Sequence, residues 1–553
     1  MPPLKRLAPL PIAFAASALW ILFGPFAAYP PLSYVDPWFY AGYFTNFPFL
    51  LLQGGFSYYV SRLPWIIPGL IAFRIAPPAL ATLLLYTGVM GVSVACVYWI
   101  VRWHYERAPA ILAAVLFATN PYFVASVVWL YPDGSAIAYG MIALALFLRP
   151  HGSRAWNVVL GASALTLSGL ANMSGAPMVV GVAMIPLWQS RGVIRELTRD
   201  AIRIAAGATA TTAVMMLASR ILLGNWLVFM PQIDQWLYSV RNPSWLHQMW
   251  GTEPYLAGAT RLFLPLVVLA WGALHLRFRK ASQASSAAYV AALVCCALYA
   301  FQEFVLNSVV LRVAYHSVYL VAPVLTFAGI AIGEMMRNAK RSRMIAMGAA
   351  GTGLPLLFNQ LGVIHTDPRI WIVFACLATA TILTRGAIAC LLLLIAGFAG
   401  PALDPRLGTI WSHESLLHPP SVNAGLRAAD FDWMMRAQSW VAPRIDRTSR
   451  VRVWWDDFGN KSTPFHTFAA MYIDENGVIP KAFSDHCGSA LWDIVGERAN
   501  LIYFTRRPDG PADVRAHIAA CGFTPRQELH TTIPLAGKDV FVTLFQIHSH
   551  SPQ

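Results

Sequence analysis

The chain has 553 residues, of which 57% are hydrophobic and only 12% are charged, and its mean hydropathy is +0.53. Soluble domains carry about 25% charged residues, so the composition excludes an ordinary soluble protein. The net charge of +14 is uneven, because the chain up to Leu403 carries +15 and the remainder −1. This excess of basic charge lies in the hydrophobic part and forms no basic face on a folded module, so we expect no nucleic-acid partner.

The first expectation is therefore a polytopic α-helical membrane protein. A transmembrane helix needs about 20 mainly apolar residues, and thirteen stretches approach or meet this requirement. In chain order the predicted spans are 10–28, 79–100, 109–129, 134–149, 156–171, 175–190, 201–223, 261–276, 284–303, 312–334, 343–363, 370–384 and 386–403.

The basic residues between the spans predict the orientation. With a cytoplasmic N-terminus, 17 Lys and Arg residues fall in inside loops and six in outside loops. Basic residues accumulate in cytoplasmic loops, so this count favours that orientation. An odd number of spans then places the chain after the last span outside the cytoplasm. We expect an integral protein of a bacterial inner membrane whose C-terminal part is periplasmic.

Two predicted outer loops, 28–79 and 224–260, are too long to be simple connections. Both are rich in Trp, Tyr, Phe and Pro and carry little charge. Aromatic residues of this kind settle at the membrane–water interface. We therefore expect half-buried helices in these loops, roofing a cavity that opens to lipid.

The polar tail, 404–553, is predicted to be a small α/β domain. Its cysteines, Cys487 and Cys521, could pair in an oxidising compartment, and their spacing leaves that pairing open. The predicted strands are 451–455, 499–504 and 539–545, and the predicted helix is 512–521.

Two aspartates stand at the outer ends of predicted spans, where a carboxylate beside hydrocarbon is costly and a functional role is a natural hypothesis. Asp36 follows the first span and is itself followed by Pro37. Asp133 directly precedes the fourth span. Each also has a structural interpretation as the N-cap of a helix.

The arrangement of these aspartates resembles the GT-C superfamily of membrane glycosyltransferases. An aspartate opens a long aromatic outer loop that ends in Tyr58 to Trp65, and a second aspartate stands at the next outer turn. The nearest likeness is to the branch of protein O-mannosyltransferases and aminoarabinose–lipid A transferases. The resemblance implies that Asp36 is the catalytic base. Asp133 matches the second acidic position, and it would orient the acceptor or hold the base.

The sequence departs from the family pattern at one point. Family members often carry two acids at the first position, whereas Pro37 and Trp38 follow Asp36 here. A lone carboxylate counts against a metal site, so we assign no metal ligand and no cofactor. The sequence leaves open whether the reaction uses a divalent cation.

The tenth predicted span begins with a basic residue and a His/Tyr cluster before an aliphatic-Pro step, as family members often do. The resemblance implies that Arg312 meets the phosphate of a lipid-linked sugar, because the planar guanidinium suits phosphate oxygens. Tyr315, His316 and Tyr319 would supply further donors, and Arg62 is a second phosphate candidate. The alternative is an arginine that reaches the interface among belt aromatics, with His316 as a satisfied polar residue.

Two acids of the second outer loop, Asp234 and Glu253, either contact the acceptor or keep that loop solvated. The sequence has no glycine-rich loop of the Walker or Rossmann type, which favours a lipid-phosphate donor over a nucleotide sugar.

These residues predict an inverting glycosyltransferase. It would move a sugar from a polyprenyl-phosphate donor to a lipid, glycan or protein acceptor at the outer membrane face. A transporter or lipid flippase is the alternative from another class, but charges are nearly absent from the span centres, with Arg220 as the obvious exception. An oligosaccharyltransferase using a pyrophosphate-linked glycan is a further alternative.

The orientation predicts which positions a membrane-impermeant thiol reagent reaches. In a background without native cysteines, Ser415→Cys and Asn476→Cys should react from outside intact spheroplasts. Ser153→Cys, in a predicted inside loop, should react only after lysis. The reverse pattern would overturn the placement of the tail.

Overall fold

The structure is a computed structural model that falls into two compact units. It describes residues 35–242 except 119 and 129, then 281–306, 318–338, 424–445, 450–456, 498–520, 523–535 and 538–549, with His316 and isolated residues within 13–18, 265–277 and 465–472. The first unit takes its residues from Met1–Phe26, Ser61–Trp65 and Leu83–Ser421. The second takes them from Ala27–Val60, Ile66–Thr82 and Val422–Gln553.

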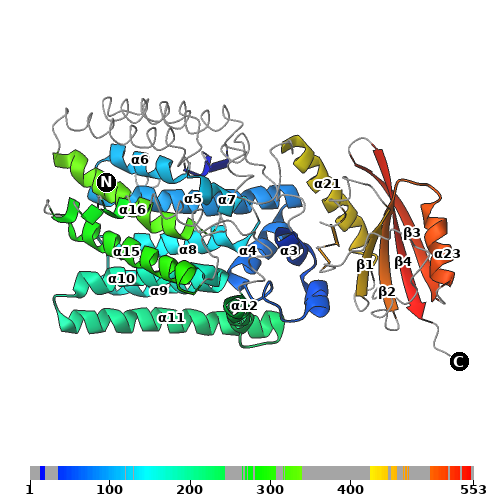
Figure 1. Cartoon of the computed structure of the whole chain (residues 1–553), viewed down its shortest axis with the longest axis horizontal. Coiled ribbons are helices and arrows are strands. Elements are labelled where there is room, and N and C mark those ends of the chain that lie inside the picture. Colours follow the sequence, from blue (N-terminus) through cyan, green and yellow to red (C-terminus); the bar gives the residue numbers. More distant parts are fainter. Residues whose placement is uncertain are drawn as a thin grey trace. The chain divides into compact units, whose positions relative to one another are not determined.

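The first unit is a bundle of helices (Figure 1). Within it α8 packs on α9, α9 on α11, α10 on α15, and α15 on α16. The first residues of α5 belong to the second unit. In chain order the bundle contains α5 (Pro78–His104), α6 (Arg107–Ala118), α7 (Pro121–Val127), α8 (Pro132–Phe147), α9 (Arg154–Ala171), the 3-10 turn η1 (Met173–Gly175), α10 (Ala176–Ser190), α11 (Ile194–Leu223), α12 (Met230–Arg241), α15 (Gln283–Phe304) and α16 (Val318–Asn338).

Most predicted spans that fall on described residues coincide with single helices. The span predicted at 109–129 differs, because it is two helices, α6 and α7. The Asn120 side chain accepts a hydrogen bond from the Phe123 amide at 3.3 Å, and Pro121 occupies the first turn, so a new helix starts there. The spans predicted at 343–363, 370–384 and 386–403 lie outside the described residues, as do most of 10–28 and 261–276.

Three described helices, α5, α11 and α15, are long and apolar enough to cross a membrane. Three further apolar helices are shorter: Leu63–Ile75, Pro132–Phe147 and Val318–Ala331. Helix α11 turns apolar side chains outward, with Ile202 62%, Val214 59% and Ile221 73% exposed. Such a surface is unfavourable in water and suits contact with lipid tails.

Glycines let neighbouring helices approach closely in this bundle. A Cβ on Gly207 of α11 would lie 2.3 Å from the Val159 carbonyl oxygen of α9. A Cβ on Gly181 of α10 would lie 2.6 Å from the Ala291 carbonyl oxygen of α15. Lipid supplies no hydrophobic force between helices, so close backbone packing at small residues carries much of their association.

The second unit joins part of the first predicted outer loop to the tail. Helix α3 (Val35–Gly54) and most of α4 (Leu63–Ile75) come from that loop, and α21 (Ala424–Val441) comes from the tail. The Gln438 side chain of α21 donates a hydrogen bond to the Thr45 hydroxyl of α3 at 3.3 Å. The predicted loop 28–79 is thus largely helical, and part of the predicted loop 224–260 forms α12.

The tail contains a four-stranded sheet with the order β1-β2-β4-β3. Strand β1 is parallel to β2, whereas β4 is antiparallel to both β2 and β3. Successive side chains of a strand point to opposite faces. Accordingly, Trp454 packs in the core beside Val514 and Ile518 of α23, while Trp455 stacks on Phe465. The strands and last helix are β1 (Arg450–Trp455), β2 (Arg498–Thr505), α23 (Gly510–Ala520), β3 (Phe523–Leu535) and β4 (Lys538–Ser549).

The three predicted strands coincide with β1, β2 and β4, and the predicted helix 512–521 with α23. Strand β3 and helix α21 were not predicted. Strand β3 contains Pro525 and Pro534 and many polar residues, which disfavour a central strand but are tolerated at a sheet edge, where β3 lies. Cys487 and Cys521 lie outside the described residues.

The close approach of α9 and α11 predicts the effect of adding one methyl group. Gly207→Ala should destabilise the protein by about 1–3 kcal/mol, because the added carbon meets backbone that cannot rotate away. Gly88→Ala in α5 is the matched control, since its Cβ would meet no described atom within 4 Å. It should be neutral or stabilise by up to about 1 kcal/mol through helix propensity. Thermal unfolding in detergent compares the two, and equal stabilities would contradict the packing.

Candidate functional site

The carboxylate of Asp133 is the centre of the candidate site. Asp133 is the second residue of α8 and is fully buried. The residue that caps α8 is Tyr131, without a side-chain hydrogen bond, so the interpretation of Asp133 as an N-cap is wrong. The Asp133 side chain instead contacts residues of other elements, and the positive end of the α8 dipole also favours its charge.

Two donors from distant parts of the chain meet one oxygen of this carboxylate. The Asn172 side-chain amide donates to Asp133 Oδ1 at 2.7 Å, and the Tyr319 hydroxyl donates to the same oxygen at 2.5 Å. Asn172 ends α9, and Tyr319 lies in the first turn of α16. The starts of α8 and α16 and the end of α9 therefore meet at one carboxylate.

A tight turn holds both donors in place. The Asn172 side-chain oxygen accepts from the Ser174 amide at 3.1 Å, which fixes the amide so that its nitrogen faces Asp133. The Tyr299 hydroxyl of α15 donates to the Ser174 carbonyl at 2.6 Å, and its ring stacks on that of Tyr319 with centroids 6.5 Å apart. These contacts leave the two donors little rotational freedom.

Positive and aromatic groups complete the surroundings. Arg62 is 1% exposed, and its guanidinium carbon lies 5.1 Å from the centre of the Tyr131 ring. Its charge interacts favourably with the Asp133 carboxylate. His316 Nε2 lies 3.9 Å from Asp133 Oδ1. Four residues singled out from the sequence are thus brought together: Arg62, Asp133, His316 and Tyr319.

The second oxygen of the carboxylate, Asp133 Oδ2, is buried and accepts no hydrogen bond from the described residues. Leaving a buried acceptor unsatisfied costs about 1–3 kcal/mol, and more for a charged group. This cost is relieved when a bound molecule donates an O–H or N–H to Oδ2. The site is therefore chemically suited to a polyhydroxylated or amine-bearing ligand.

Asp36 belongs to the second unit and has a different environment. It is the second residue of α3 and is half-buried, and its Oδ1 accepts a hydrogen bond from the Tyr59 hydroxyl at 2.9 Å. The Tyr59 ring packs against Phe39, Tyr40 and Tyr58, with centroids 4.7, 5.9 and 5.3 Å apart. A packed aromatic cluster thus orients the carboxylate while leaving part of it accessible.

The remaining predicted site residues are placed as follows. Arg312, Tyr315 and Glu253 lie outside the described residues. Asp234 is exposed on α12, as expected for a residue that keeps its segment solvated. Arg220 is exposed near the end of α11, and its guanidinium donates to the Gly224 carbonyl, so it satisfies a helix terminus.

Two contributors were missed by the sequence interpretation. Asn172 lies between the predicted spans 156–171 and 175–190, and Tyr299 lies within the predicted span 284–303. An asparagine between two apolar spans is the kind of polar residue that needs a partner at membrane depth, and this was the available signal. Within the described residues, no group of three His, Cys, Asp or Glu side chains could hold a metal ion.

No protein-family model matches the chain, and no curated protein matches it significantly. Among solved structures it is similar to ArnT from Cupriavidus metallidurans bound to undecaprenyl phosphate, at 11% identity and a TM-score of 0.46, over 96% of this chain and 97% of that chain. The same protein in the apo state gives 14% identity and a TM-score of 0.45 over the same shares.

The chain is also similar to the Archaeoglobus fulgidus oligosaccharyltransferase in complex with zinc and sulfate. The identity is 13% and the TM-score 0.43, over 90% of this chain and 67% of that chain.

The hydrogen bonds around Asp133 predict a specific stability effect. Tyr319→Phe keeps the stacked ring but removes one of the two donors to a buried carboxylate, and should cost about 1–3 kcal/mol. Tyr289→Phe in α15 is the control, because the Tyr289 ring contacts Phe327 edge-on and its hydroxyl has no hydrogen bond among the described residues. Thermal unfolding in detergent should separate the two variants. Equal melting temperatures would show that the hydroxyl of Tyr319 does not support the carboxylate.

Proposed function

We propose that the protein is a membrane glycosyltransferase that moves a sugar from a polyprenyl-phosphate donor to a lipid, glycan or protein acceptor. The observation that supports this most is the buried Asp133 carboxylate, with one oxygen held by Asn172 and Tyr319 and the other open to a ligand donor. Sugars and their acceptors carry the hydroxyl groups that such an oxygen accepts. The apolar helices of the first unit suit a prenyl chain.

The basic residues near Asp133 support an anionic donor. Arg62 is buried next to the carboxylate, where a phosphate could share its guanidinium, and His316 lies nearby. Arg312 keeps its proposed role as the main phosphate ligand from the resemblance. A guanidinium that meets phosphate oxygens stabilises the negative charge that develops as the sugar leaves.

The proposed reaction inverts the anomeric centre. An acceptor hydroxyl attacks the anomeric carbon, the bond from that carbon to the phosphate oxygen breaks, and the phosphate leaves with the electron pair. Asp36 takes the hydroxyl proton as general base. Its half-buried carboxylate and the hydrogen bond from Tyr59 suit that role, because the group is oriented and still accessible. Asp133 orients a substrate hydroxyl.

The transfer is proposed to occur at the outer face of a bacterial inner membrane. The count of basic residues between the predicted spans supports this side. The tail with its four-stranded sheet would then lie in the periplasm.

The two aspartates are tested with amide substitutions and transfer assays. The purified full-length protein is supplied with radiolabelled polyprenyl-phosphate sugars and a panel of membrane acceptors. Asp36→Asn should lower turnover by about 10²–10⁴-fold, because an amide takes no proton, while the amide oxygen still accepts from Tyr59. Asp133→Asn should have a smaller effect on turnover if it orients a hydroxyl.

Asp539→Asn is the matched control, since Asp539 is exposed on β4 and the variant should transfer at the wild-type rate. Near-normal transfer by a folded Asp36→Asn protein would remove the proposed base. Donor release without any sugar transfer to the panel would favour the transport alternative.

A further inference from the structure

A second polar region lies at the other end of α8, far from Asp133. There an open cavity of about 450 Å³ is lined by the end of α8, the start of α9, the end of α10 and the start of α15, with His104 from α5. Its volume falls within the range of about 300–1,000 Å³ typical of small-ligand sites. By the predicted orientation this is the cytoplasmic end of the bundle.

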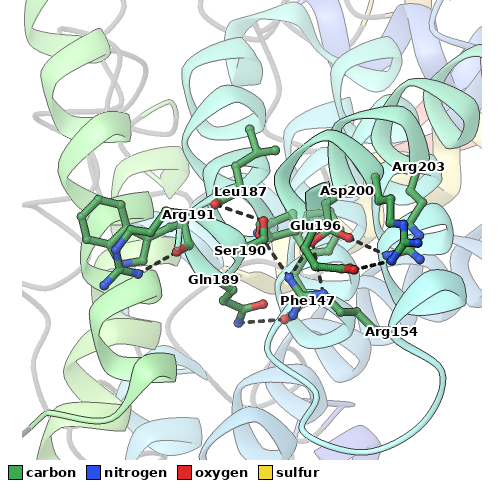
Figure 2. A network of polar contacts seen from close by, with 12 residues as sticks. Phe147, Arg154, Leu187, Gln189, Ser190, Arg191, Glu196, Asp200 and Arg203 are labelled. Atoms are coloured by element: carbon green, nitrogen blue, oxygen red, sulfur yellow. Dashed lines mark hydrogen bonds and ion pairs between the residues drawn. The ribbon is translucent and has the colours of Figure 1, made fainter. Parts of the chain in front are cut away.

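The charges of this cavity are positive. Arg149 and Arg154 line it, and none of the described residues that line it is Asp or Glu. Arg154 shares the buried carboxylate of Asp200 with Arg203, at 2.6 and 2.8 Å (Figure 2), so these three groups together retain one positive charge. Arg149 is exposed and forms no ion pair within the described part of the chain.

Two donors lie around Gly152: the Arg149 guanidinium and the Asn157 side-chain amide, whose nitrogen also donates to the His151 carbonyl at 3.5 Å. Gly152 has φ +101°, and a Cβ on it would lie 3.8 Å from both the Arg149 guanidinium carbon and the Asn157 amide nitrogen. Helix α9 begins two residues later, and its N-cap residue, Ser153, makes no side-chain hydrogen bond to the helix. The first amides of α9 are therefore available to an anion, and the helix dipole favours negative charge there.

Two carbonyl groups at this end of α8 have hydrogen-bond partners within the bundle. The last carbonyls of α8 would repel an anion, but the Phe147 carbonyl accepts from the Gln189 amide at 3.3 Å (Figure 2), and the Leu148 carbonyl lies 3.0 Å from His104 Nε2. These two carbonyls therefore already have hydrogen-bond partners, which weakens their repulsion of an anion in the cavity.

The surface beside the cavity is apolar and suited to lipid. Trp156 is 66% exposed and Leu160 is 51% exposed, one helical turn apart on α9, which begins at Arg154. Exposed tryptophans mark the head-group level of a bilayer. A ligand whose phosphate meets Arg149 could lay its acyl chains along this stripe.

We propose that this cavity binds the phosphate head group of an anionic phospholipid from the adjoining leaflet. Basic pockets between transmembrane helices on the cytoplasmic side are suited to such head groups. The proposal does not depend on the transfer reaction, and it concerns residues outside the Asp133 site.

The test is lipid-dependent thermal stability of the full-length protein in a neutral detergent. Phosphatidylglycerol should raise Tm in a saturable way, whereas phosphatidylcholine should not. Arg149→Gln should weaken the apparent affinity for phosphatidylglycerol about tenfold, because one charge-assisted contact is lost. Asn157→Leu, which removes the second donor at nearly constant volume, should weaken it as well.

The control is Arg191→Gln, which removes the same charge at the same end of the bundle. The Arg191 guanidinium carbon lies 4.0 Å from the centre of the Trp188 ring, and Arg191 does not line the cavity. The apparent affinity for phosphatidylglycerol should therefore stay unchanged. Equal stabilisation by both lipids, or equal losses in the Arg149 and Arg191 variants, would overturn the proposal. Saturation by inorganic phosphate at the same concentration as phosphatidylglycerol would overturn the lipid as occupant and assign the cavity to a soluble anion.

Discussion

A carboxylate inside an apolar helix bundle is tolerated only when other groups compensate for its lost hydration. At Asp133 this requirement determines how several elements meet. Asn172 and Tyr319 lie 39 and 186 residues away in sequence and yet donate to the same oxygen. These donors come from the turn after α9 and from the start of α16, and the Tyr299 ring stacks on that of Tyr319. Oδ2 accepts no hydrogen bond from the described residues, so it can accept one from a bound molecule.

Asp36 depends on a different kind of support. Its helix, α3, approaches the tail so closely that a Cβ on Gly42 would lie 2.4 Å from the Met471 carbonyl oxygen. The hydrogen bond between Gln438 and Thr45 ties the same helix to α21. Residues of the tail, Gln438 of α21 and Met471, therefore hold a helix that the sequence predicts within a long loop. A carboxylate held by packed aromatic rings keeps its direction without being sealed from solvent.

Local signals in the sequence were sufficient for much of this fold. Apolar runs located α5, α8, α9, α10, α11 and α15, and alternation with β-branched and aromatic residues located three of the four strands. The break at Asn120 and the edge strand β3 were not predicted. The prediction rested on hydrophobic runs, and it gave little weight to helix caps and prolines. The position of Asp133 was apparent from its place at a span end.

The partners of the candidate site were harder to foresee. Asn172 and Tyr299 carry no motif, and their relevance arises only when α9 and α15 pack beside α8. A sequence reveals that a buried carboxylate needs donors, but long-range packing decides which residues supply them. The resemblance suggested Tyr319 and Arg62 as phosphate ligands, whereas the geometry places both beside the carboxylate.

Helix α11 has a consequence for the membrane in which this protein works. Its 30 residues would extend about 45 Å, well beyond the hydrocarbon core of about 30 Å. Its first turns are charged, and Asp200 pairs with Arg154 and Arg203, while at the other end Arg220 donates to the Gly224 carbonyl that follows the helix. Between these anchors lies an apolar length close to one bilayer core. The apolar length of the helix therefore matches a bilayer of ordinary thickness. A markedly thinner or thicker bilayer would have to deform around the protein or tilt the bundle.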